Sequence, residues 1–198
     1  MELLWVRDAW ALATGDPEAP PPLTDAVAAA PPGVSPAERA EWDAAWPGQW
    51  RAAVHHAGLE PDTDLRATLH RPDLDPDRRR ELLAAVAGPT WRDRFGDSAL
   101  GDASREWSAL HSDTRISGRG RRQADHEREA LDALAPAWER GLTTIVTIPC
   151  RGEYTRVIGD HALLVTDETH EGLPRYRQAL ARFPDGPAIG AAARGARE

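Results

Sequence analysis

The stretch that decides the fold is residues 143–166, TTIVTIPCRGEYTRVIGDHALLVT, in which two apolar runs flank a short polar turn. Residues 143–149 are dense in β-branched side chains, which favour a strand. Residues 154–166 form a second run of this kind, and the Arg151-Gly152 pair between the runs is typical of a hairpin turn. The stretch therefore predicts a small antiparallel sheet, either a hairpin or a short meander.

The segments before this stretch suggest how the sheet is covered. Residues 121–140 predict a helix on which Leu131, Leu134 and Trp138 share one side. Residues 107–116, WSALHSDTRI, are expected to include a short strand. We expect the 121–140 helix to pack on the sheet.

The N-terminal half carries strong signals for helix boundaries. Ser35 and Glu38 have the spacing of a capping box, with a proline between them at the first helical position. This pattern predicts a helix over residues 36–46. The Pro47-Gly48 pair is expected to end that helix before a second one begins.

Similar but weaker signals continue toward residue 90. Residues 62–70 predict a short helix, and Asp75 predicts the N-cap of another, which ends at Gly88. The apolar face of that second helix consists of Leu82, Leu83 and Val86.

Together these segments predict an α+β protein, with a mainly helical N-terminal part and a small antiparallel sheet packed with a helix in the C-terminal part. Residues 1–100 form the helical region, with a Pro-rich loop at 14–34, and residues 101–183 form the α+β region. Residues 184–198 are expected to be a flexible tail. Whether the two regions are separate domains or share one core is left open.

Composition excludes several classes of protein. The chain of 198 residues has a formal net charge of −8, which argues against a dedicated binder of nucleic acid or anionic membranes. No apolar stretch approaches the ~20 residues of a membrane span, and residues 1–10 lack the pattern of a signal peptide. The single cysteine excludes an internal disulfide and a Cys-based zinc cluster. We expect a soluble cytoplasmic protein.

The first candidate site is the Gly- and Arg-rich segment SGRGRRQ at 117–123. Its backbone N–H groups and a following helix N-terminus would suit a phosphate, and its arginines could make bidentate contacts. The anion-binding candidates are Arg119, Gly120, Arg121 and Arg122. The third glycine of a dinucleotide fingerprint is replaced by Gln123, so a solvated loop is the competing interpretation.

The second candidate is a group of tryptophans, because three of the eight in the chain lie close together. Trp42 and Trp46 share one helix face, and Trp50 follows after the expected break. Such rings contact partners or ligands at many interfaces. Packing in the core of a small helical unit is the stronger interpretation, since each ring buries a large apolar area.

Cys150 and Arg156 have the C-x5-R spacing with which cysteine phosphatases bind phosphate. The predicted hairpin sends the two side chains to opposite faces, and the chain continues as a strand where a phosphate loop would enter a helix. The same hairpin places His161 too far from Cys150 for a nucleophile and base pair. Cys150 is therefore predicted to be a partly buried structural residue.

The histidines do not complete a metal-binding motif. His126-Glu127 begins the pattern H-E-x-x-H, but Ala130 stands where the second histidine belongs. His55 and His56 are adjacent and diverge by about 100° on a helix. Three further residues can meet only through folding, namely His161, His170 and Glu171. No metal or cofactor is predicted.

Three functions remain as hypotheses. The leading one is a non-catalytic protein-protein interaction or accessory protein, because no catalytic constellation is complete and the chain has Trp-rich helices and a Pro-rich segment. The alternative is a small hydrolase or transferase that acts on a phosphorylated or anionic substrate through an Arg-rich site. A nucleic-acid-associated regulator that uses the same arginines is a third and weaker hypothesis.

Overall fold

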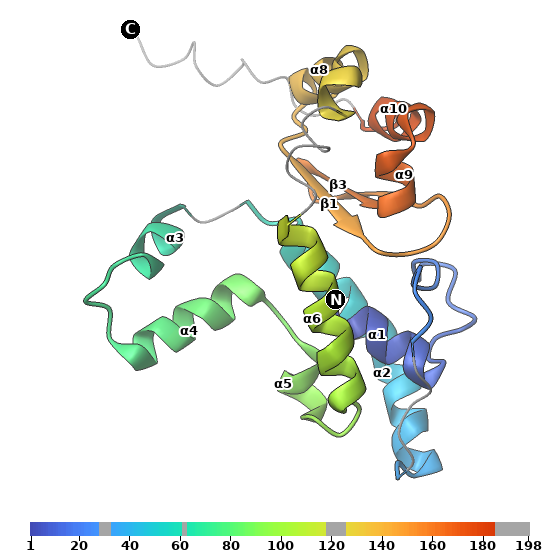
Figure 1. The fold of residues 1–198 in the computed structure, drawn as a ribbon, viewed down its shortest axis with the longest axis vertical. Helices are drawn as coiled ribbons and strands as arrows, with labels where there is room; N and C mark the ends of the chain where they lie inside the picture. The colour runs from blue at the N-terminus through green and yellow to red at the C-terminus, as the bar shows by residue number, and fades with distance from the viewer. Residues whose placement is uncertain (28–32, 61–62, 118–125, 185–198) are drawn as a thin grey trace, which may run out of the picture.

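The structure is a computed structural model that describes residues 1–27, 33–60, 63–117 and 126–184. It confirms the α+β class: most helices precede a small sheet, which lies in the C-terminal part (Figure 1). The candidate arginine segment, apart from Ser117, and the predicted flexible tail, apart from Pro184, lie outside the described residues. Within the described residues, no helix is long and apolar enough to cross a membrane.

The sheet has three strands in the order β1-β3-β2. Strand β3 (Ala162–Thr166) runs antiparallel to β2 (Thr155–Ile158) and parallel to β1 (Thr144–Ile148). The hairpin therefore joins β2 to β3. The prediction of a purely antiparallel sheet with a turn at Arg151-Gly152 was wrong. The cause is burial, because all five residues of β3 are buried and the most apolar strand takes the centre.

Helices from the C-terminal part cover one face of the sheet. These are α8 (Leu131–Glu139), α9 (Asp167–Glu171) and α10 (Leu173–Ala181). Leu163 and Val165 of β3 pack with Tyr176 and Leu180 of α10 in one apolar cluster.

The segment predicted as one helix over 121–140 is described from residue 126, with helical residues 126–129 followed by α8. The predicted apolar side is confirmed only for Leu134, which packs against the apolar cluster, whereas Leu131 and Trp138 are 53% and 65% exposed. The small side chains of Ala130 and Ala137 are buried instead, which lets the helix approach α10 closely.

The other face of the sheet joins the tryptophan core. Ala162 and Leu164 of β3 pack in a cluster with side chains of α1 (Glu2–Trp10) and α2 (Pro36–Ala57). Since neighbouring residues of a strand point to opposite faces, β3 contributes to both clusters at once. The sheet therefore connects the helical part to the C-terminal part.

Helix α2 begins with the predicted capping box, in which Ser35 accepts from the Glu38 N–H and the Glu38 carboxylate accepts from the Ser35 N–H. It does not end at Pro47 but continues to Ala57. A proline inside a helix costs ~3 kcal/mol. This cost is offset because side chains four residues apart are buried along one face, namely Trp42, Trp46, Trp50 and Val54.

The strand expected within residues 107–116 is also wrong, since α6 (Asp102–Ser117) is a helix. Ser104 and Trp107 are buried, three residues apart, which is helical spacing. A polar segment anchored by one large ring satisfies its backbone locally as a helix, whereas an added strand would need a partner strand.

Between α2 and α6 the chain forms three short helices: α3 (Thr63–Leu69), α4 (Pro76–Ala87) and α5 (Trp91–Phe95). Trp91 of α5 is fully buried against the tryptophan core. Helices α3 and α4, by contrast, extend away from the rest of the molecule (Figure 1). We call residues 63–87 the α3–α4 arm.

Candidate functional site

The α3–α4 arm presents apolar side chains to solvent. In the part of the chain that the structure describes, Leu82 is the one residue of α4 that is buried. Leu83 and Val86, which share the predicted apolar face, are 53% and 39% exposed. The sequence predicted this amphipathic helix, and the described residues cover Leu82 of its apolar face but leave Leu83 and Val86 exposed.

The arm nevertheless has a defined geometry at both ends. At its corner, Arg79 donates to the carbonyl oxygens of Leu69 and Arg71, at 2.9 and 2.8 Å. At its base, His56 of α2 lies 3.1 Å from the Val86 carbonyl oxygen. A Cβ on Gly88 would come 2.2 Å from the His56 ring, so this contact requires glycine.

The charges of α4 are paired with one another. Arg78 contacts Glu81 at 2.8 Å, and Arg80 contacts Asp77 at 2.7 Å, all four side chains being largely exposed. The second half of the helix, ELLAAVA, carries Glu81 alone as a charged residue. The surface of the arm is therefore apolar toward its base and charge-paired toward its tip.

The three candidate tryptophans lie in the core. Trp42, Trp46 and Trp50 are 2%, 0% and 6% exposed. Trp46 stacks on Trp50 with ring centroids 5.7 Å apart, and its Nε1 donates to the Leu3 carbonyl oxygen at 2.8 Å. These low exposed fractions agree with the interpretation that the three rings pack in the core. A direct partner contact through them stays a prediction, and it would need rings that are now buried to become accessible.

The anion-binding candidates Arg119, Gly120, Arg121 and Arg122 lie outside the described residues. Anion binding there stays a prediction, and with it the alternative of an enzyme for anionic substrates.

Cys150 is fully buried where the end of β1 meets the Pro-rich segment, in a single bridge with Leu23. Burial raises the pKa of its thiol to about 12, although the nearby Arg7 guanidinium acts in the opposite direction. A thiol with this pKa is not ionised at neutral pH and is a poor nucleophile. Cys150 is thus placed as a structural residue.

The two proposed partners of Cys150 are engaged elsewhere. Arg156 lies on β2 and forms an ion pair with Glu18 at 3.8 Å. The His161 carbonyl oxygen accepts from Thr143 N at 2.8 Å, which places His161 beside the start of β1 while Cys150 follows its end.

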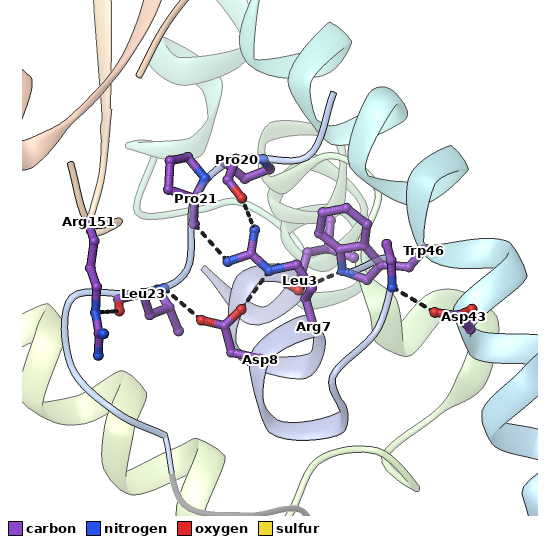
Figure 2. Close-up of polar contacts among 10 residues, drawn as sticks. Leu3, Arg7, Asp8, Pro20, Pro21, Leu23, Asp43, Trp46 and Arg151 are labelled. Carbon is purple, nitrogen blue, oxygen red and sulfur yellow. Dashed lines mark hydrogen bonds and ion pairs between the residues drawn. The ribbon is translucent and has the colours of Figure 1, made fainter. Parts of the chain in front are cut away.

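A buried polar cluster fixes the Pro-rich segment to α1 (Figure 2). Arg7 donates to the carbonyl oxygens of Pro20 and Pro21 and to Asp8. Asp8 in turn accepts from Leu23 N at 2.6 Å. Because these groups satisfy one another inside the fold, the cluster has a structural role, and sequence reasoning missed it.

One open cleft lies between the C-terminal end of α1 and the N-terminal end of α2. It has a volume of about 790 Å³ and is lined by Trp10, Arg39 and Asp43, among others. Asp43 accepts from Ala13 N at 2.6 Å, so its carboxylate holds the adjoining turn. The described lining includes the hydroxyls of Thr14 and Ser35 but no histidine, and the Ser35 hydroxyl is held in the helix cap with Glu38.

Most histidines singled out in the sequence are separated. His55 is exposed on α2, and His56 contacts the arm. Among the described residues, no three His, Cys, Asp or Glu side chains form a group that would hold a metal. His126 and His170, however, lie close together beside Tyr176.

Comparison with known proteins finds no matching family model, no matching curated protein and no matching solved structure.

Proposed function

We propose that this protein is a non-catalytic protein-protein interaction or accessory protein of the cytoplasm, and that the α3–α4 arm is the element that docks on its partner. The observation that carries the proposal is the exposure of Leu83 and Val86 on a helix that extends away from the rest of the molecule. The lone cysteine, which is a free thiol, supports the reducing compartment.

The physical argument concerns the cost of an uncovered helix. A helix of about 12 residues is marginal in water when it stands alone, and most helical stability in proteins comes from packing an apolar face. Helix α4 has strong capping, because Asp75 accepts from the N–H groups of Asp77 and Arg78. Capping sets where the helix begins, but covering its apolar face needs a second surface.

The pattern of α4 indicates the kind of surface it fits. Leu83, Val86 and Ala87 have the i, i+3, i+4 spacing by which an amphipathic helix enters an apolar groove. Since the charges at the tip are already paired, the complementary surface is expected to be an apolar groove without a dense charge cluster. The proposed partner is a protein with such a groove.

The experiment places a photo-crosslinking amino acid at position 83, and in a second protein at position 51, an exposed site on α2. We expect a discrete crosslinked protein from position 83 and none from position 51. With the crosslinker at position 83, the species should be lost when Val86→Asp is added and kept when Arg51→Asp is added. Equal crosslinking from both positions, or a species from position 83 that is unaffected by Val86→Asp, contradicts the proposal. Sedimentation velocity of the isolated chain shows whether the partner is a second copy.

A further inference from the structure

Folding brings three polar rings together on the side of the sheet away from the tryptophan core. His126 comes from the helical residues 126–129, His170 from α9 and Tyr176 from α10. The ring centroids of His126 and His170 are 5.8 Å apart, and Tyr176 lies 5.8 Å from the first and 4.7 Å from the second. His126 is distant in sequence from His170 and Tyr176, so no spacing motif predicted the cluster.

Two polar atoms of this cluster are buried without a hydrogen bond. The Nε2 of His126 and the hydroxyl of Tyr176 have no hydrogen-bond partner among the described residues. Tyr176 is fully buried, and burial raises the pKa of its hydroxyl, with the charge of Glu127 acting in the same direction. Buried polar groups in native proteins are nearly always satisfied, so an orphaned pair side by side indicates a missing ion or water.

The separation of the two histidine rings fits a shared metal ion. Two imidazoles on one tetrahedral zinc, each with a Zn–N distance of ~2.0–2.1 Å, have ring centres about 5–6 Å apart. Imidazole nitrogen is a preferred ligand of Zn²⁺, Ni²⁺ and Cu²⁺. The neighbouring carboxylate of Glu127 adds a negative charge that favours a cation over an anion.

We propose that His126, His170 and Tyr176 hold a divalent transition-metal ion, with Zn²⁺ as the first choice. The two histidines supply nitrogen ligands, the Tyr176 oxygen is the third donor, and solvent completes the coordination. When the phenol ligates, its proton passes to solvent. The ion would connect residues 126–129 to α9 and α10. This site is independent of the α3–α4 arm.

The test uses the full untagged chain and Zn²⁺ itself, titrated by calorimetry and by competition with a chromophoric chelator. We expect one ion per chain, with the affinity reduced ~10–100-fold or more in His126→Asn. His55→Asn removes an exposed histidine and is the matched control, expected to bind as the parent does. Co²⁺ should give the intense visible absorption of a tetrahedral site, and this band should be lost in His126→Asn.

Tyr176→Phe keeps the buried ring and removes the donor. We expect it to bind Zn²⁺ at least tenfold more weakly while its far-UV circular dichroism matches that of the parent. Parent-like affinity in Tyr176→Phe contradicts the third ligand. No saturable binding by the parent, or parent-like binding by His126→Asn, overturns the site. His126 is only half-buried, so its replacement tests the site even if a His170 variant fails to fold.

Discussion

Helices α2 and α4 begin in the same way and differ in what covers them. Each starts after a capping side chain, Ser35 or Asp75, with a proline at the first helical position. Helix α2 buries a row of tryptophans and continues through an internal proline, whereas α4 buries Leu82 alone and leaves Leu83 and Val86 exposed. Local signals therefore determine where a helix begins, and packing determines how stable it is.

The largest expected contrast comes from removing one apolar side chain from each helix. Trp46→Ala deletes a fully buried ring and its hydrogen bond to Leu3, and should lower the free energy of unfolding by ~3–5 kcal/mol. Leu83→Ala should change it by less than ~0.5 kcal/mol, because the side chain is exposed. Urea unfolding of both variants measures the difference. Similar losses of unfolding free energy in the two variants would contradict the difference in packing between α2 and α4.

The next largest difference in stability is expected between removing a buried arginine and removing an exposed one. Arg7→Met should cost about 3 kcal/mol, because it leaves a mostly buried Asp8 without its guanidinium and frees two proline carbonyl oxygens. In the arm, Arg78→Met breaks an exposed pair with Glu81 and should cost less than ~0.5 kcal/mol. Thermal unfolding compares them, and an Arg7 variant as stable as the parent would show that the cluster in Figure 2 is not stabilising.

The burial of the Cys150 thiol should also affect how the free energy of unfolding depends on pH. Because the folded pKa of Cys150 is raised from 9.0 to about 12, the thiol stays protonated in the folded chain while the unfolded chain ionises. Its contribution is complete below about pH 9 and is lost as the pH rises toward 12, by up to ~1.4 kcal/mol per pH unit. Cys150→Ala should remove this part of the slope in urea unfolding between pH 8.5 and 10.5. An unchanged slope contradicts the burial of the thiol.

The smallest effects come from the caps. Ser35→Ala should lower the free energy of unfolding by about 1 kcal/mol, because it removes the acceptor for the Glu38 N–H. Asp75→Ala should leave global unfolding unchanged and instead speed tryptic cleavage at Arg80, since only the arm loosens. A matching loss of global stability in Asp75→Ala would show that arm and body unfold together.

Local patterns in the sequence predicted the capped ends of α2 and α4 correctly, and predicted the packing poorly. Ser35 with Glu38, and Asp75 with Gly88, mark helix ends because capping involves neighbouring backbone groups. The passage of α2 through Pro47 depended on tertiary packing of Trp46 and Trp50, including the bond from Trp46 Nε1 to the Leu3 carbonyl oxygen, which no local pattern contains.

Strand pairing in the sheet and the surroundings of the candidate sites also depend on tertiary contacts that local sequence patterns do not contain. Two β-rich runs next to each other favoured a hairpin at Arg151-Gly152. In the structure Cys150 pairs with Leu23 instead, and β1 pairs with β3. The exposed face of α4 and the ring cluster around Tyr176 arise from tertiary placement, so their residue types could be read from the sequence but their surroundings could not.

Native-state hydrogen exchange of the isolated chain tests the comparison between α2 and α4 most directly. The account predicts that amides within residues 80–87 of α4 exchange through local opening with little protection, while those within residues 46–54 of α2 exchange only through global unfolding. Protection of α4 equal to that of α2 would contradict the view of the arm as a helix whose apolar face awaits a partner.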